Sequence, residues 1–318
     1  MSLPCSFASP VWLPSGDAET LWAPFFSLRE KVSLRREIWS TPDQDRIAVD
    51  WIDANPEAPL LVLFHGLGSS SRGHYALSLG AALQHRGWGG CFVNFRGCGG
   101  IDNLLPRAYH AGDSDEIAWI IERLASPARP LYAVGVSLGG NALLKYLGEE
   151  RPPLLTGAAA VCAPVDLIAT AAHIAQQRFY DWYFVHTLKR QMGRYARRFP
   201  QLVDWSAVHR AKTLRAFDDA FTAPVHGFPD AMSYWQRSSS GPGLQRITVR
   251  TLLINSRNDP IVPIDAVEKW PRSKAVHVCF TQYGGHVAYV QGRFPGRTRW
   301  LPEQILRFFQ GEEPHAEA

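Results

Sequence analysis

The sequence lacks the features that mark several large classes of protein. No apolar stretch approaches the roughly 20 residues that cross a bilayer as a helix, so no transmembrane segment is expected. The 33 basic and 29 acidic residues nearly balance, and no long basic block or basic-aromatic motif is present. This balance argues against nucleic acid as a partner. No internal repeat or low-complexity tract is present either.

Cysteine is also scarce. The five cysteines are odd in number, form no C-x-x-C pair and show no metal-ligand spacing. In a chain of 318 residues this pattern argues against a disulfide framework and supports no metal site. The first residues lack the basic and unbroken apolar regions of a signal peptide. We therefore expect a cytoplasmic protein. The glycines of "RGCGG" do not form a dinucleotide fingerprint, so no cofactor is expected.

What is present is a large apolar fraction, 46% of residues, arranged in alternating strand and helix patterns. Arg46–Ile52 alternates like an early antiparallel strand, after an irregular segment of forty-odd residues. Continuous apolar runs, typical of parallel strands covered on both faces, lie at 59–66, 89–97, 131–137, 157–164, 249–259 and 275–280. Helical patterns lie between them, including Asp113–Ala125, where Asp113 and Glu116 resemble a capping box. The predicted fold class is α/β, with a mostly parallel central sheet flanked by helices.

One long segment breaks this alternation. Between Pro164 and Arg250 there is no convincing strand, and the pattern is helical and rich in aromatics. We predict a core of residues 1–164 and 247–318 with a helical cap, 165–246, inserted late in the sheet. The cap aromatics could line an acyl-chain channel or form the cap's own core; they are Phe179, Tyr180, Trp182, Tyr183 and Phe184.

A G-x-S-x-G pattern centres on Ser137, in "AVGVSLGG". An apolar run precedes it and a helical pattern follows it, which is the context of a nucleophile elbow. Glycines at 135 and 139 would let strand and helix approach, and a strained turn would present the hydroxyl. The helix N-terminus would then face the place where negative charge develops. We expect Ser137 to be a nucleophile, with a plain structural turn as the alternative.

A serine hydroxyl needs a base to take its proton. His286 follows the last predicted strand in a glycine-rich loop, where a base would stand. Asp259 stands at the end of the strand pattern 249–259 and would orient that histidine. The chain order Ser, Asp, His is the order of an α/β-hydrolase. Asp166, after the preceding strand, is the rival acid, whereas Asp265 is interpreted as a helix N-terminal residue.

The tetrahedral intermediate of such chemistry needs hydrogen-bond donors. We expect an oxyanion hole from the backbone N–H groups of Leu138, directly after the nucleophile, and of Leu67, in the glycine-rich loop "HGLG". His65 would support this loop. A tight turn without function is the alternative for the same glycines.

Seven stretches together resemble the YheT-type branch of the α/β-hydrolase superfamily. They are "HGLGSSSRGHY", "NFRGCGG", "RAYHAGDSDE", "GVSLGGNALLKYLGE", "AFDDAFTAPVHGFPDAMSYW", "SRNDPIVP" and "GGHVAY". The resemblance extends from about Trp39 to Phe309. It implies an α/β-hydrolase fold and a Ser-Asp-His esterase or lipase, with eukaryotic relatives that act on acylglycerols or phospholipids. Carried over to this chain, the triad is Ser137, Asp259 and His286.

Two further polar groups have a structural and a functional interpretation. Arg96, Tyr109, His110 and Asp113 could shape the pocket floor, but a loop pinned by arginine–carboxylate pairs is favoured. The basic stretch Lys189–Phe199 could touch a membrane surface, but a solvated helix face is favoured.

The sequence thus predicts a serine carboxylesterase or lipase that cleaves an apolar ester or lipid through an acyl-enzyme. An acyltransferase using the same triad, and a silent binding protein of the same fold, are the alternatives.

Overall fold

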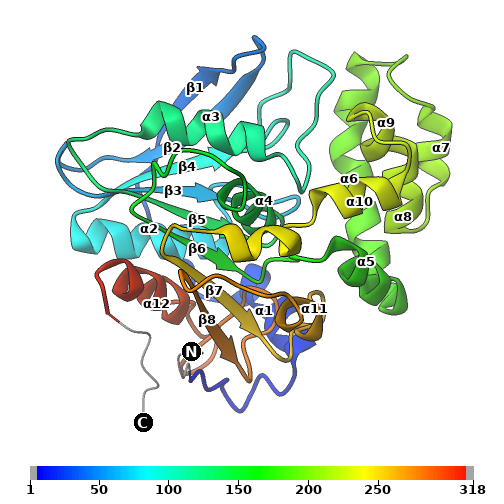
Figure 1. Cartoon of the computed structure of the whole chain (residues 1–318). Helices are drawn as coiled ribbons and strands as arrows, with labels where there is room; N and C mark the ends of the chain where they lie inside the picture. The colour runs from blue at the N-terminus through cyan, green and yellow to red at the C-terminus, as the bar shows by residue number, and fades with distance from the viewer. Residues whose placement is uncertain (1–5, 313–318) are drawn as a thin grey trace.

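The six apolar runs, the alternating stretch 46–52 and one further strand form an eight-stranded sheet in the computed structural model, which describes residues 6–312 (Figure 1). The strand order is β1-β2-β4-β3-β5-β6-β7-β8. Only the pairs β1–β2 and β2–β4 are antiparallel, so the sheet is mostly parallel, as predicted. The strands are β1 (Arg35–Ser40), β2 (Arg46–Ile52), β3 (Leu60–Phe64), β4 (Gly89–Asn94), β5 (Leu131–Val136), β6 (Gly157–Val161), β7 (Thr251–Ser256) and β8 (Val276–Thr281).

Helices cover both faces of this sheet (Figure 1). On one face lie α2 (His74–Arg86) and α12 (Trp300–Phe309), which pack against each other. On the other lie α3 (Ser114–Leu124) and α4 (Leu138–Leu147). Strands β3, β4, β5, β6 and β7 are buried along their whole length, because both faces are covered.

The segment between β6 and β7 is helical, and within the described residues no strand interrupts it. Figure 1 shows these helices at one end of the sheet. They include a small apolar core of their own, with Leu188, Tyr195 and Phe221 among its buried residues. The helices are α5 (Leu167–Gln176), α6 (Arg178–Arg198), α7 (Trp205–Arg210), α8 (Leu214–Phe217), α9 (Ala223–Val225) and α10 (Ala231–Ser238), with a π-helical turn at Asp218–Thr222 and a 3-10 helix at Gly241–Arg246.

The N-terminal region differs from the irregular segment that was expected. It contains α1 (Gly16–Phe26) and the edge strand β1. The side chain of Ser15 caps α1 by accepting a hydrogen bond from Ala18 N at 3.2 Å. Pro24 lies inside the helix and obscures its pattern in the sequence.

The predicted capping box of α3 is also wrong. Asp113 occupies the N-cap position but makes no capping hydrogen bond. Its carboxylate instead binds Arg107, at 2.7 Å, and Glu116 binds Arg96, at 2.5 Å. Charge pairing across loops therefore displaces the local cap.

Candidate active site

Ser137 lies on the sharp turn between β5 and α4, with φ 53° and ψ −118°. A non-glycine residue with positive φ is strained, and such strain is characteristic of functional turns. A Cβ on Gly135 would lie 2.5 Å from the carbonyl oxygen of Gly139. A Cβ on Gly139 would in turn lie 2.4 Å from the oxygen of Phe64. Both glycines are thus required by close backbone contacts, as the elbow pattern predicts.

The structure brings Ser137, His286 and Asp259 together. His286 Nε2 lies 2.9 Å from Ser137 Oγ, and His286 Nδ1 lies 2.8 Å from Asp259 Oδ2. The serine follows β5, the aspartate follows β7 and the histidine follows β8. The imidazole therefore stands between a hydroxyl and a carboxylate, an arrangement that can move a proton from one side of the ring while the other side is held.

Asp259 is fully held in this orientation. Its side chain has no exposed surface, and its second oxygen accepts hydrogen bonds from Ile261 N at 2.8 Å and Val262 N at 3.0 Å. Asp166, the rival acid, lies elsewhere. It caps α5 through Ala169 N and pairs with Lys269.

The loop after β3 lies directly against the serine. A Cβ on Gly66 would be 3.1 Å from Ser137 Cβ. Gly66 N donates to the hydroxyl of Tyr75 at 3.0 Å, and Gly68 N donates to the hydroxyl of Tyr109 at 2.9 Å. Leu67 N, between them, makes no hydrogen bond with residues 6–312.

His65 supports this loop through its two ring nitrogens, as expected. Its Nδ1 lies 2.7 Å from Gly66 O, and its Nε2 accepts a hydrogen bond from Phe95 N at 3.1 Å. Complete burial lowers the pKa of His65 to about 4, so the ring is neutral at pH 7. A neutral ring with its proton on Nδ1 satisfies both contacts.

Leu138, the other predicted oxyanion donor, is the first residue of α4. The first N–H groups of a helix have no partner within the helix. In the described part of the chain its N–H makes no hydrogen bond. Two unpartnered N–H groups thus flank the serine, on the elbow and on the facing loop.

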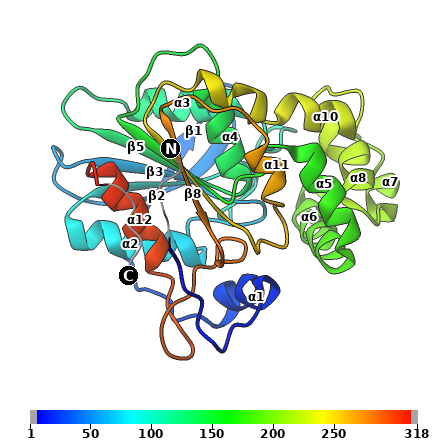
Figure 2. The same ribbon diagram turned by 60° about the horizontal axis from the view of Figure 1, so that its bottom comes forward.

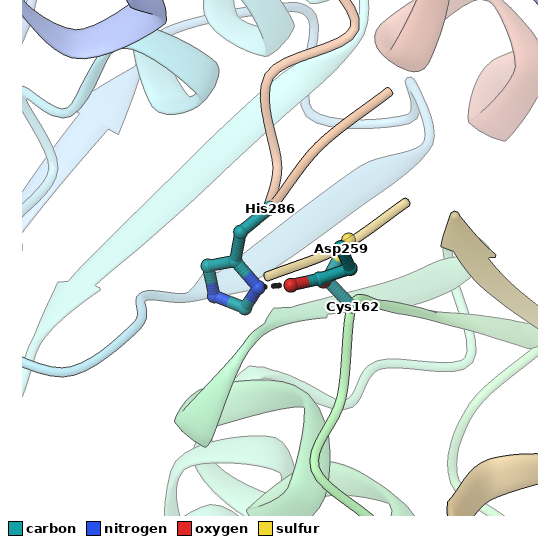
Figure 3. A group of neighbouring side chains, drawn as sticks. All are labelled: Cys162, Asp259 and His286. Carbon is teal, nitrogen blue, oxygen red and sulfur yellow. Dashed lines mark hydrogen bonds and ion pairs between the residues drawn. The ribbon is translucent and has the colours of Figure 1, made fainter. Parts of the chain in front are cut away.

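Cys162 lies beneath the histidine loop (Figure 3). Its sulfur accepts a hydrogen bond from Val287 N at 3.3 Å, and burial raises its pKa well above the usual range. Ligand atoms of Cys162, Asp259 and His286 lie within 4.8 Å of one another, the one such group of three among the described residues. A protonated thiol and a carboxylate already engaged by three hydrogen bonds fit a hydrogen-bonded site better than a metal centre. The absence of a metal stays a prediction.

A cavity of about 940 Å³, including space open to solvent, extends from Ser137 beneath the helices that follow β6. Its lining is mostly aliphatic and aromatic, with Leu188 and Phe184 from α6. One buried carboxyl, Asp218, faces it, and burial raises the pKa of this group to about 6. Trp235 Nε1 donates to Asp218 at 2.8 Å. An apolar chain fits this lining.

The aromatic residues of α6 divide between the two roles that the sequence left open. Phe184 lines the cavity, and Tyr180 is buried and donates to Asp17 of α1 at 2.7 Å. Phe179, Trp182 and Tyr183 are exposed and serve neither role. In the basic stretch, Lys189 donates to backbone oxygens and Arg194 pairs with Asp102, while most of its other basic side chains are exposed.

The polar residues after β4, for which the sequence offered a structural and a functional interpretation, also divide between the two. Arg96 is buried between Asp43, Asp45 and Glu116, the structural pairing that was favoured. Tyr109 and His110, by contrast, line the cavity. Asp113 pairs with Arg107 and does not reach the cavity lining.

Sequence reasoning missed the support that α1 gives to the histidine loop. His286 N donates to Thr20 Oγ1 at 2.8 Å, and Gly284 N donates to Glu19 Oε2 at 3.1 Å. The same carboxylate accepts a hydrogen bond from Asn258, beside Asp259. More than 230 residues separate these partners in sequence, and the only local signal was the Ser15 cap.

Three cysteines, Cys91, Cys98 and Cys162, are buried free thiols. Cys279 is disulfide-bonded, a bond that the sequence did not predict. Cys5 lies outside the described residues. No helix within residues 6–312 is both long and apolar enough to cross a membrane.

The parallel sheet, the strained serine turn and the histidine loop define the α/β-hydrolase class, and comparison with known proteins agrees. The alpha/beta hydrolase fold family matches residues 59–292. The Escherichia coli protein named "Putative esterase YheT" is 35% identical over 276 residues, which is 83% of this chain and 81% of that protein. The chain therefore belongs to the α/β-hydrolase fold family, in its YheT-type branch.

Two relatives and one solved structure extend this comparison. Human phospholipase ABHD3 is 27% identical, over 96% of this chain and 78% of its own length. The medium-chain fatty acid ethyl ester synthase/esterase 2 of Saccharomyces cerevisiae is 33% identical, over 80% of this chain and 62% of its own. The Pyrococcus furiosus esterase Pf2001 has the same fold, with a TM-score of 0.59 at 15% identity, over 90% of this chain and 98% of its own. The family is one of esterases and related hydrolases.

Proposed function

We propose that this chain is a serine hydrolase that cleaves carboxylic esters of apolar acyl groups through Ser137, His286 and Asp259. The observation that carries the proposal is the position of the His286 ring, 2.9 Å from the Ser137 hydroxyl and 2.8 Å from the Asp259 carboxylate. The apolar cavity that begins at Ser137 supports an acyl chain as the part of the substrate that is bound.

The mechanism follows from these positions. His286 Nε2 takes the proton of Ser137 as Oγ attacks the ester carbonyl carbon. The N–H groups of Leu67 and Leu138 bind the oxyanion that forms. The tetrahedral intermediate expels the alcohol, which receives the proton from His286 and leaves an acyl-enzyme. Water, deprotonated by His286, then releases the carboxylic acid and restores Ser137. Asp259 stabilises the imidazolium throughout.

The helices between β6 and β7 are, in this proposal, a cap of residues 165–246 on a core of residues 1–164 and 247–318. Cap side chains such as Thr170, Leu188 and Phe217 complete the wall of the cavity opposite Ser137. They therefore select the acyl chain, while the core supplies the chemistry.

An acyltransferase that uses the same triad is the second candidate. The specific observation that favours it is the yeast relative, whose name gives both an ester synthase and an esterase activity. The same acyl-enzyme would pass its acyl group to an alcohol instead of water. A silent binding protein of the same fold is less well supported, because all three triad side chains are within hydrogen-bond distance.

The substrate is a small-molecule ester or lipid, and no nucleic acid is part of the proposal. A cytoplasmic location is also proposed. The three buried free thiols support it, whereas the disulfide of Cys279 does not.

A fluorophosphonate probe tests the nucleophile directly. Ser137 Oγ would attack phosphorus and displace fluoride, which adds one phosphonyl group to the protein. We expect one adduct by intact-protein mass on the wild type and none on Ser137→Ala. Ser126→Ala, an exposed serine in the loop before β5, at the other end of that strand from Ser137, is the matched control and should label fully. Absence of an adduct on folded wild type would overturn the proposal.

Product analysis separates the two enzymatic candidates. A p-nitrophenyl acyl ester is offered with and without an added alcohol, and the acyl products are quantified. A hydrolase yields the free acid, whereas an acyltransferase yields the new ester at the expense of the acid.

A further inference from the structure

An exposed aromatic surface lies on α1 and the chain around residue 294. Phe25, Phe26 and Phe294 expose 61%, 59% and 69% of their surface, and Trp12 and Trp22 lie between them. We call these five residues the aromatic patch. Figure 2 shows α1 at the lower edge of the molecule, where the chain that follows β8 also turns. Large rings at such exposure are uncommon on a surface that faces only water.

The rings form one contiguous cluster. Trp22 lies 4.7 Å from Phe26, 5.3 Å from Phe294 and 5.3 Å from Trp12, between ring centroids. Both indole N–H groups are satisfied by backbone oxygens, of Gly292 and of Pro295. The patch therefore presents carbon to its surroundings, with no polar group that requires a partner.

Cations border the patch. The two stretches 28–31 and 292–299 contain five basic residues and one acidic residue, Glu30. That single carboxylate is shared between Arg297, at 3.1 Å, and Arg299, at 2.7 Å. Arg29, Lys31 and Arg293 are exposed without an acidic partner among the described residues. The border is therefore positively charged.

We propose that the aromatic patch docks this protein on an anionic lipid surface. Aromatic rings flanked by arginine and lysine are suited to the boundary between lipid headgroups and acyl chains, where the rings are buried and the cations meet lipid phosphates. A second copy of this chain is a poorer occupant, because a symmetric contact would place the basic border against itself.

The N-terminal half of α1 reaches the active site. Thr20 and Glu19 of this helix accept hydrogen bonds from the histidine loop, at His286 N and Gly284 N. Tyr180 of α6 also donates to Asp17 of α1. Docking through α1 would thus hold both the histidine loop and the first turn of α6 close to the lipid surface.

Vesicle co-sedimentation tests the docking, and it does not depend on catalysis. The full-length Ser137→Ala protein is mixed with phosphatidylcholine vesicles, with and without phosphatidylglycerol. We expect binding to the anionic vesicles that weakens at high salt. Replacing Phe25, Phe26 and Phe294 together by Glu should reduce the bound fraction about tenfold or more. Ile38→Glu, an exposed apolar residue on β1, is the matched control and should bind normally.

A second variant separates the cations from the rings. Lys31→Glu with Arg293→Glu should weaken binding to anionic vesicles and abolish its salt dependence. Sedimentation velocity then tests whether a second copy of this chain occupies the patch. A wild-type protein that is dimeric, with a triple Glu variant that is monomeric, would overturn the proposal. Absence of vesicle binding by the parent protein, or equal binding by the triple variant, would also overturn it. The same three Phe→Glu substitutions, made in the protein that keeps Ser137, should leave hydrolysis of a water-soluble p-nitrophenyl ester at the normal rate. Failure of docking and failure of the proposed activity are therefore distinguished.

Discussion

The hydroxyl oxygen of Tyr109 accepts a hydrogen bond from Gly68 N at 2.9 Å. The hydroxyl of Tyr75 does the same for Gly66 N at 3.0 Å, on the other side of Leu67. The two phenols therefore hold both amides that flank Leu67, and the N–H between them, unpartnered among residues 6–312, could bind the oxyanion of the proposed reaction. Preorganised donors of this kind need no rearrangement during the reaction, which is the source of their effect on rate.

We expect Tyr109→Phe to lower kcat about tenfold with little change in KM, because the loop is loosened but Leu67 N–H is still present. Steady-state kinetics on a p-nitrophenyl ester measures this split. Tyr132→Phe is the matched control, since its hydroxyl donates to Phe309 O on the far side of the sheet. If kcat is unchanged, or if KM alone rises because Tyr109 also lines the cavity, then the hydroxyl does not position the loop.

Asp259→Asn should reduce kcat by about 10⁴. The new amide NH₂ would face His286 Nδ1 and force the ring proton onto Nε2, where the serine proton must be accepted. Asp166→Asn is the matched control and should retain activity, because Asp166 pairs with Lys269 and caps α5. The reverse pattern of losses would make Asp166 the acid of the site.

Much of the site was predictable because its residues are marked by local patterns. Ser137 is marked by G-x-S-x-G, and Asp259 and His286 by their places just after buried strands. The support from Glu19 and Thr20 was not predictable, because it depends on contacts between segments more than 230 residues apart.

In the fold, too, the elements marked by a local sequence pattern were predicted and those that depend on their surroundings were not. Parallel strands buried on both faces give continuous apolar runs, and these were found within a few residues of their bounds. Strand β1 was missed because it lies at the edge of the sheet and has no continuous apolar run. Five of its six residues are not fully buried, and they include Arg35, Arg36 and Glu37. The Asp113 cap was wrongly predicted because Arg107, a partner outside the helix, takes its carboxylate.

Gly135→Ala should destabilise the protein by about 3 kcal/mol or more, because the new methyl group would meet the backbone at Gly139 and Gly140, which cannot move independently. Gly193→Ala is the matched control. Its Cβ would meet nothing within 4 Å in the interior of α6, so we expect a gain of about 0.5–1 kcal/mol. Urea unfolding of both variants measures the difference. Similar midpoints for the two would mean that the elbow tolerates a side chain at position 135.

The stability of the protein should fall in mild acid, and His65 should contribute measurably to that fall. Burial lowers the pKa of His65 in the folded protein to about 4, from about 6.5 for an unperturbed histidine. The folded state therefore binds this proton less readily than the unfolded state. The contribution of the neutral ring is fully present above pH 6.5 and is lost as the pH falls towards 4, at about 1.4 kcal/mol per pH unit.

His65→Gln isolates this contribution, because glutamine keeps a donor and an acceptor but does not titrate. We expect the variant to be less stable than the wild type at neutral pH, and the difference in unfolding free energy to narrow by about 1.4 kcal/mol per pH unit below about pH 6. The other buried histidines, His74, His110 and His226, titrate alike in both proteins and cancel in the comparison. Urea unfolding at several pH values measures the difference. A constant difference across that range would show that His65 is protonated equally in both states, so that its ring would not be the neutral support of the Gly66 carbonyl.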